Sequence, residues 1–273
     1  MATFGSSATA SIPHSFIRLE TKPTASLAYS FIPAKGGSSQ NHSLIVFLNG
    51  LGLPASSWYP TISLLTRRLS HPAILAYDRF GQGFTRDRDP LEVGADDPAH
   101  AHDCMDVVRD LRQLLLQIVA KYQLAPGTGI FFVGNSIGCA IARLFTQTYS
   151  HTVCALVLLD SVMANSDMVS IYPNPDSPDF EREHLPLPEG VTVEGLREVR
   201  AKMDRIFSPI HGIMGNAEGL TRRNLAELLP YSDYPILTGV ANEGPWLTVV
   251  GHGFKKFAED SLRARTIHIH QKT

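Results

Sequence analysis

The sequence has few cysteines and a net charge close to zero, and each of these features excludes a class of protein. The 273 residues include only three cysteines, Cys104, Cys139 and Cys154, and no two of them have the close spacing of a metal site. An odd number of well-separated cysteines is typical of reduced, mostly buried thiols in an intracellular protein. The formal net charge is −2 and the basic residues are scattered, so the basic footprint of a nucleic-acid-binding protein is missing.

Long apolar runs are also missing. No stretch approaches the roughly 20 apolar residues that span a bilayer, so the sequence predicts no membrane span. Residues 1–15 hold no positive cluster followed by an apolar run, which predicts no secretory signal. Residues 271–273 (Gln-Lys-Thr) differ from a peroxisomal Ser-Lys-Leu address. These absences predict a cytoplasmic protein.

Strands and helices are predicted to alternate along the first part of the chain. Short apolar runs predict strands at 16–20, 26–33, 44–48, 73–77, 130–133 and 155–159. Apolar residues at helical spacing predict helices at 56–70, 103–122 and 137–149, the second of them capped by Asp103. Such alternation predicts an α/β fold: a mostly parallel sheet with right-handed crossovers and helices on both faces.

The pattern changes after Val162. Residues 171–190 are dense in proline, which favours an irregular excursion, and helices are predicted near 193–206 and 221–229. We expect a cap over the carboxyl edge of the sheet, where open α/β folds bind ligands. The runs 245–250 and 265–270 predict late strands. The expected units are a core over 1–162, a cap or lid insertion over 163–240, and a C-terminal part of the core, or end of the cap, over 241–273.

The motif that indicates a catalytic function is Gly134-Asn135-Ser136-Ile137-Gly138. It matches Gly-x-Ser-x-Gly and stands between a predicted buried strand and a predicted helix, which is the context of a nucleophile elbow. The glycines leave room for a tight turn, the hydroxyl is exposed above the sheet, and the helix N-terminus favours developing negative charge. Ser136 is therefore the predicted nucleophile. The alternative is a glycine-rich turn that only closes a strand.

A serine nucleophile also needs donors for the oxyanion. The N–H of Ile137, which follows the nucleophile, is one predicted donor. The second is expected from the loop after the strand 44–48, and Leu51 N–H in Asn49-Gly50-Leu51-Gly52 is the predicted donor. The alternative for this loop is a plain turn.

Over about residues 40–160 the sequence resembles the α/β-hydrolase fold family. The resemblance is carried by residues 49–52, 77–83, 134–138 and 158–161. Most members of that family have histidine where Asn49 stands, a position that orders the loop. More narrowly, the chain is similar to fungal hydrolases of toxin and polyketide gene clusters, a group that includes the acyl-CoA hydrolase of the mycophenolic acid pathway. The resemblance implies a peroxisomal location as an alternative to the cytoplasm.

Asp160 is the predicted acid of a catalytic triad. It ends an apolar strand one strand beyond the nucleophile, so its carboxylate is expected near Ser136, where it would orient a histidine. The resemblance implies the same role, because the fungal relatives take the acid from this position. The alternative for Asp160 is a helix cap or a loop aspartate. Asp78 also ends a strand, and the resemblance implies that it braces the adjacent turn.

The base must come late in the sequence, because this family's chain order is Ser, Asp, His. His252, His268 and His270 are the candidates, with His252 placed first. A surface or loop histidine is the alternative reading of each. The resemblance implies further chain and a packing helix after the catalytic histidine, so a chain that stops before the true base is also expected as an alternative.

These residues together predict a serine hydrolase that cleaves an ester or an acyl thioester, acyl-CoA among them, through an acyl-enzyme. The proline-rich cap favours a large apolar acyl group as the small-molecule substrate. No metal and no cofactor are needed, and the sequence leaves the oligomeric state open. The resemblance implies a place in fungal secondary metabolism or toxin biosynthesis. The alternatives are a hydrolase-like binding protein, or a truncated product, without the histidine, and C–C bond hydrolysis or a rearrangement on the same scaffold.

Overall fold

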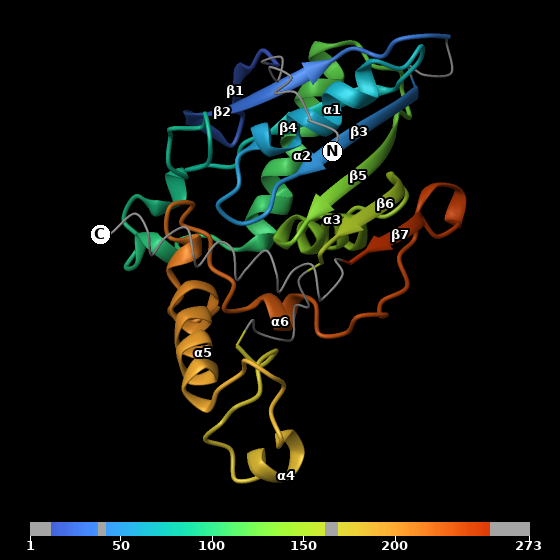
Figure 1. The fold of residues 1–273 in the computed structure, drawn as a ribbon. Coiled ribbons are helices and arrows are strands. Elements are labelled where there is room, and N and C mark those ends of the chain that lie inside the picture. Colours follow the sequence, from blue (N-terminus) through green and yellow to red (C-terminus); the bar gives the residue numbers. More distant parts are fainter. Residues whose placement is uncertain (1–11, 38–41, 162–168, 252–273) are drawn as a thin grey trace, which may run out of the picture.

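The computed structural model describes residues 12–37, 42–161 and 169–251, which form one mixed sheet flanked by helices (Figure 1). The strand order is β1-β2-β4-β3-β5-β6-β7. The strands are β1 (Ser15–Leu19), β2 (Lys22–Ile32), β3 (Ser43–Leu48), β4 (Ala73–Tyr77), β5 (Gly129–Asn135), β6 (Val153–Leu159) and β7 (Trp246–Val250). From β4 to β7 all neighbours are parallel, whereas β1 and β2 are antiparallel additions. The predicted mostly parallel sheet is confirmed.

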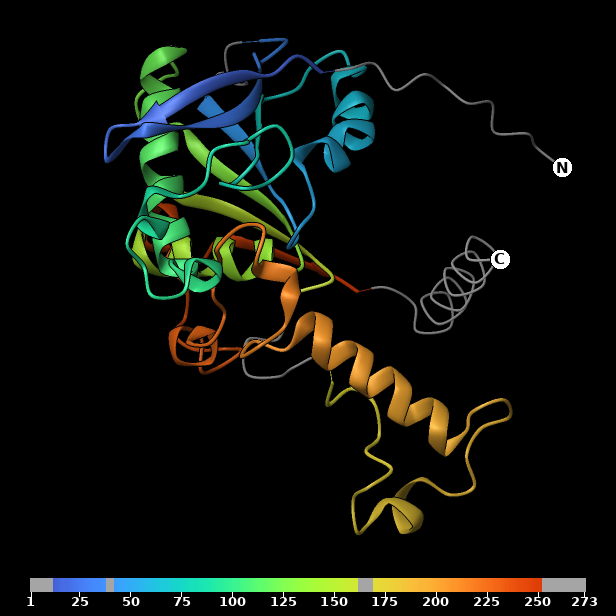
Figure 2. The same cartoon turned by 90° about the vertical axis from the view of Figure 1, so that its left-hand side faces the viewer.

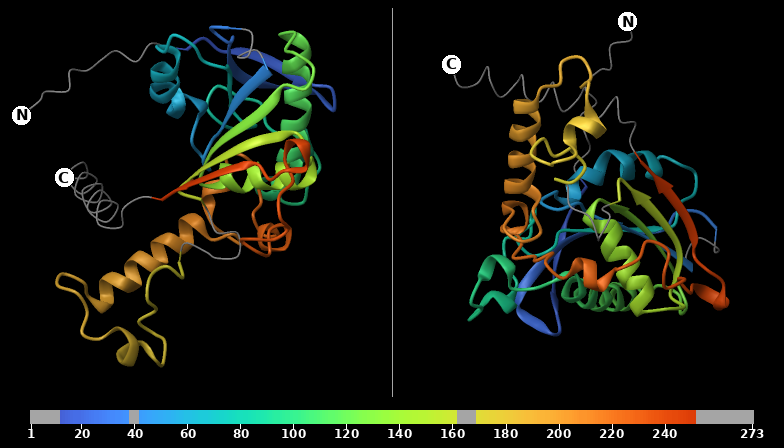
Figure 3. Two further views of the ribbon diagram at one scale, coloured as in Figure 1. Left: turned by 90° about the vertical axis from the view of Figure 1, so that its right-hand side faces the viewer. Right: turned by 90° about the horizontal axis from the view of Figure 1, so that it is seen from below.

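Helices cover both faces of the sheet. Figure 3 shows α1 (Tyr59–Thr66) on one face and α2 (Cys104–Lys121) and α3 (Ile137–Thr148) on the other. Because successive strand side chains point to opposite faces, β3 and β4 supply both layers of core. Val46 packs toward α2 and α3, and its neighbour Phe47 packs with Trp58 and Ile62 under α1.

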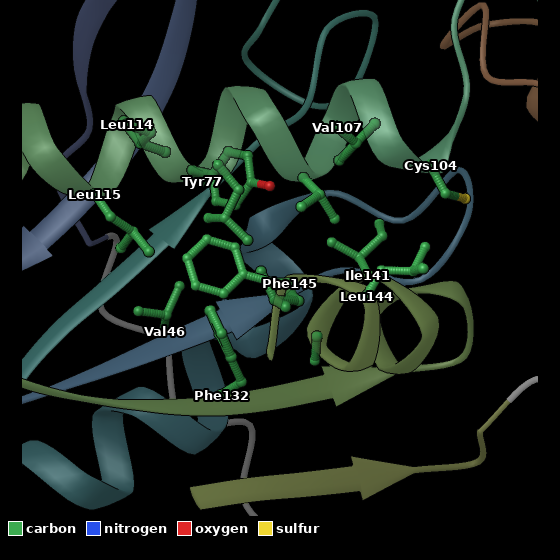
Figure 4. Packing of buried hydrophobic residues seen from close by; sticks show 14 of the residues in the cluster. Val46, Tyr77, Cys104, Val107, Leu114, Leu115, Phe132, Ile141, Leu144 and Phe145 are labelled. Carbon is green, nitrogen blue, oxygen red and sulfur yellow. The ribbon is translucent and has the colours of Figure 1, made fainter. Parts of the chain in front are cut away.

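The core between the sheet and the α2–α3 pair is aromatic and aliphatic. Phe132 of β5 and Phe145 of α3 meet edge to face, with ring centroids 5.0 Å apart. Figure 4 shows Val46 and Tyr77 on the sheet side of this layer, with Leu144 on α3 and Leu114 on α2. All of these side chains are buried. This layer fixes α3, and therefore its first residue, against the strands.

Two predicted helices are shorter than the sequence pattern suggested. The helix predicted at 56–70 begins with a 3₁₀ turn (Ala55–Trp58), and α1 ends at Thr66; its Pro60 lies in the first turn, where the missing N–H costs nothing. Within the predicted 221–229, only α6 (Leu225–Leu228) is helical, because Pro230 disfavours helical geometry in the preceding residue. The helix predicted at 193–206 is confirmed as α5 (Val193–Phe207).

An excursion leaves the carboxyl edge of the sheet after β6. It carries α4 (Phe180–His184) and α5, which project away from the strands (Figure 2). The chain then returns to form β7 beside β6, which confirms the strand predicted at 245–250. The strand predicted at 265–270 lies outside the described residues. Among the residues that the structure describes, no helix combines the length and apolarity needed to cross a membrane.

Candidate active site

Ser136 stands on a strained turn between β5 and α3. Its φ is +53° and its ψ is −119°, a conformation that non-glycine residues rarely adopt and that clusters at functional sites. The Ser136 N–H donates to the Leu159 carbonyl at 3.0 Å, and the Ser136 carbonyl accepts from Cys139 N–H at 3.0 Å. The neighbouring strand and the first turn of α3 therefore hold the strained residue in place.

The two glycines of the motif are required by close backbone contacts. A Cβ on Gly134 would lie 2.8 Å from Cys139 N, and a Cβ on Gly138 would lie 2.3 Å from the Leu48 carbonyl oxygen. Both distances are shorter than real Cβ contacts. The elbow is therefore packed at backbone level against α3 on one side and against the end of β3 on the other.

We expect Gly138→Ala to lower both stability and activity. The added methyl group must push α3 away from Leu48 and Asn49, so overpacking should cost about 1–3 kcal/mol of unfolding free energy. A displacement of about 1 Å at the elbow should cost roughly 100-fold in kcat. Urea denaturation and ester hydrolysis measure the two effects. Gly37→Ala is the matched control, because its added Cβ meets nothing within 4 Å; equal effects of the two variants would contradict the packing argument.

The two predicted oxyanion donors lie in segments that touch. Ile137 is the first residue of α3, and Leu51 lies in the loop 49–52 after β3. A Cβ on Gly50 would lie 2.7 Å from the Asn135 side-chain oxygen, so this loop packs against the elbow. Neither the Leu51 N–H nor the Ile137 N–H donates to an acceptor within residues 12–37, 42–161 and 169–251. Among the described residues, neither N–H group has an acceptor, which is what an oxyanion donor requires.

The side chain of Asn49 holds the loop 49–52 in place. Its side chain is buried, donates to the Tyr77 carbonyl at 2.8 Å and accepts from Trp58 Nε1 at 3.0 Å. These two hydrogen bonds tie the loop to β4 and to the turn before α1. An amide therefore serves at the position where most α/β-hydrolases have histidine.

Asp160 leaves the sheet next to Ser136. Asn135 and Leu159 are register partners on β5 and β6, so the residues that follow them emerge side by side at the carboxyl edge. Asp160 has a φ of +46°, and its N–H donates to the Val250 carbonyl at 2.8 Å. The end of β7 is thereby fixed beside the predicted acid.

Asp78 braces a turn, as the resemblance implied. Its carboxylate accepts from Ala55 N–H at 2.6 Å and from Phe84 N–H at 2.9 Å. Burial raises the pKa of Asp78, while these two hydrogen bonds act in the opposite direction. A Cβ on Gly83 would lie 2.5 Å from the same carboxylate, so this carboxylate has no room for a ligand on that side.

The candidate bases His252, His268 and His270 all lie outside the described residues. His211, in the loop after α5, is exposed and pairs with Asp204 through Nε2 at 2.7 Å. The contact with Asp204 accounts for the position of the His211 side chain, so no catalytic role needs to be assigned to it.

The cysteines nearest the site are not competing nucleophiles. Cys139 lies one turn beyond Ser136, and its thiol donates to the Gly134 carbonyl at 3.2 Å. Burial raises the pKa of Cys139 to about 11 and that of Cys104 to about 12. Both thiols are therefore protonated at neutral pH and unreactive. Within the described part of the chain, no group of His, Cys, Asp and Glu side chains could hold a metal ion.

Comparison with known proteins decides the family. The sequence profile of the Alpha/beta hydrolase family matches residues 45–267, which is most of the chain. The chain belongs to the α/β-hydrolase family. No curated protein matches the sequence. The narrower similarity to fungal toxin and polyketide cluster hydrolases finds no support in these comparisons and stays a prediction.

Solved structures of several hydrolases resemble this α/β-hydrolase at low identity. A putative lipase from Acinetobacter baumannii has a TM-score of 0.44 and 14% identity, covering 97% of this chain and 94% of the other. The epoxide hydrolase VrEH1 from Vigna radiata has a TM-score of 0.48 and 14% identity, covering 96% and 98%. A structure from a study of Nitrososphaera gargenis carboxylesterases has a TM-score of 0.44 and 15% identity, covering 95% and 100%.

Proposed function

We propose that this α/β-hydrolase cleaves an ester or an acyl thioester through an acyl-enzyme on Ser136. The observation that carries the proposal is the strained φ of +53° at this serine, between a parallel strand and the N-terminus of α3. Strain of this kind persists where the surrounding structure enforces it, and functional sites are its usual location. The family supports hydrolysis, and the serine, rather than an aspartate, at the elbow supports an acyl intermediate.

The proposed reaction has two steps. The Ser136 oxygen attacks the carbonyl carbon, while a histidine takes the hydroxyl proton and the Leu51 and Ile137 N–H groups bind the oxyanion. The C–O or C–S bond then breaks, and the leaving alkoxide or thiolate receives that proton. Water attacks the acyl-enzyme in the same way, which releases the carboxylic acid and restores Ser136. Asp160 orients the histidine and stabilises its charged form.

The proposed substrate carries an apolar acyl group. A pocket of about 480 Å³ has Cys139 and Ser161, which are close in sequence to Ser136 and Asp160, among its lining residues. Leu156, Leu247 and Val249 also line it. Most of its lining residues are apolar, with Arg143 and Asp233 as charged exceptions, and a mostly apolar lining favours a hydrocarbon group. A thioester such as acyl-CoA, and a place in fungal toxin or other secondary metabolism, rest on the sequence resemblance alone.

The direct test is labelling of the full chain by a fluorophosphonate probe. We expect Ser136 to displace fluoride and form a phosphonyl adduct, because only an activated serine reacts rapidly with such a probe. Fluorescence in a gel and peptide mapping measure the site. Ser136→Ala should abolish labelling, and Ser57→Ala, at an exposed serine of the 3₁₀ turn, should keep it.

Two results would contradict the proposal. Adducts that persist at another serine in Ser136→Ala would move the nucleophile elsewhere. Folded wild-type protein that is never labelled would favour the alternative of a hydrolase-like binding protein.

A further inference from the structure

Residues 215–221, called here the docked segment, lie against the turn that follows β4. Gly81 approaches the Ala217 carbonyl so closely that a Cβ at Gly81 would overlap it, and Gly81 has a φ of +72°. The Arg88 guanidinium donates to the carbonyls of Asn216 and Ala217. On the other side, Thr221 N–H donates to the His102 carbonyl at 2.8 Å. The end of the excursion is thus fastened to the core just before α6.

Glu218 extends from the docked segment into the protein. Only 1% of its surface is exposed. One carboxylate oxygen accepts from Gly52 N–H at 2.7 Å and from Gln82 Nε2 at 2.9 Å. The other accepts from Arg79 Nε at 2.8 Å. Glu218 and Gly52 are 166 residues apart in the sequence, so this is a tertiary contact between the excursion and the oxyanion loop.

Arg79 completes the contact from the opposite side. Its two terminal nitrogens donate to the Asn49 carbonyl at 2.8 Å and to the Gly50 carbonyl at 3.0 Å. Burial alone would lower the pKa of Arg79, but the facing Glu218 carboxylate raises it above its usual value. The guanidinium is therefore charged, and its partner compensates that charge in a site where both side chains are buried.

We propose that Glu218 and Arg79 are positioning residues that hold the loop 49–52 in its oxyanion-binding geometry. The pair fixes the carbonyls of Asn49 and Gly50 before Leu51 and the N–H of Gly52 after it. The Leu51 N–H lies between these fixed groups and is left to the ligand. The catalytic half of this inference rests on the proposed function; the ordering of the loop does not.

Glu218→Gln tests the proposal. The variant keeps the shape of the side chain, but its amide group must face a donor, either Arg79 or Gly52, and the Arg79 charge loses its partner. We expect faster hydrogen exchange at the Gly52 amide and at the peptide covering 49–53. With p-nitrophenyl butyrate as probe, we expect kcat to fall roughly 10- to 100-fold with little change in KM, because the oxyanion is bound only in the transition state.

Asp89→Asn is the matched control. It breaks a second buried ion pair, in which Lys22 Nζ lies 2.7 Å from Asp89 and the two side chains are 9% and 0% exposed. The side chains of this pair make their polar contacts with Asp110, Leu91 and His102 rather than with residues 49–52. Both variants should lower Tm, but only Glu218→Gln should change kcat and exchange at 49–53.

The outcomes separate this inference from the proposed function. Unchanged exchange at 49–53 in Glu218→Gln would overturn the positioning role, whether or not the protein is active. Faster exchange with an unchanged kcat would show that loop order does not serve catalysis. If the wild-type protein hydrolyses no ester, the proposed function and the catalytic half of this inference fail together, and the exchange measurement still decides whether Glu218 orders the loop.

Discussion

Replacing Ser136 with alanine is expected to lower kcat for an activated ester by roughly 10⁴- to 10⁶-fold, because loss of a nucleophile removes the covalent route altogether. Hydrolysis of p-nitrophenyl butyrate measures the loss. Weak residual activity is expected from the intact Leu51 and Ile137 donors. The variant should remain folded, since the backbone N–H and carbonyl groups of residue 136 make the hydrogen bonds that hold the turn in place.

A second variant at the same position separates catalysis from strain. Ser136→Gly should be as inactive as Ser136→Ala. It should be more stable than Ser136→Ala by about 1 kcal/mol, because glycine adopts a positive φ without a steric penalty. Urea denaturation of the two variants measures the difference. Equal stability would show that the turn stores no strain, and wild-type activity in either variant would exclude Ser136 as the nucleophile.

The second large effect is expected from one of three histidines. Alanine at the true base should lower kcat roughly 10³- to 10⁶-fold, while alanine at the other two should leave it near the wild-type value. His252 is the first choice, because it follows two positions after Val250 in the sequence, and the Val250 carbonyl accepts the Asp160 N–H.

The control for the histidine series is His151→Asn. His151 is exposed and has a φ of +68°, which asparagine tolerates, so activity should be unaffected. The pH profile gives a second readout, since loss of the true base should remove the rise of kcat/KM near the pKa of that histidine. Three alanine variants with wild-type activity would exclude all three candidates.

Local patterns were enough to predict the sheet and the elbow. The apolar runs that form β3, β4, β5 and β6 are buried on one face and buried or half-buried on the other, so their apolar sequence alone predicts them. The sequence also predicts the elbow, because its two glycines and its serine lie within five consecutive residues. Helix ends within 56–70 and 221–229 were misplaced, since proline and tertiary contacts rather than periodicity set them.

Glu218 could not be found from the sequence. It stands in a glycine-containing stretch with no motif, and its partners Gly52, Arg79 and Gln82 are all more than a hundred positions away. The only local hint was on the other side, where the stretch 77–83 suggested an ordered turn. The role of a buried carboxylate depends on the charged group that faces it, and only the three-dimensional structure identifies that group.

The docked segment also limits how the excursion can be exchanged. A chimera can take α4 and α5, which project away from the strands, from another α/β-hydrolase. If the splice lies after Leu220, it also replaces Glu218 and removes the ion pair with Arg79. A splice before Gly215 leaves that pair in place, so grafts of the excursion are best joined on the amino-terminal side of this glycine.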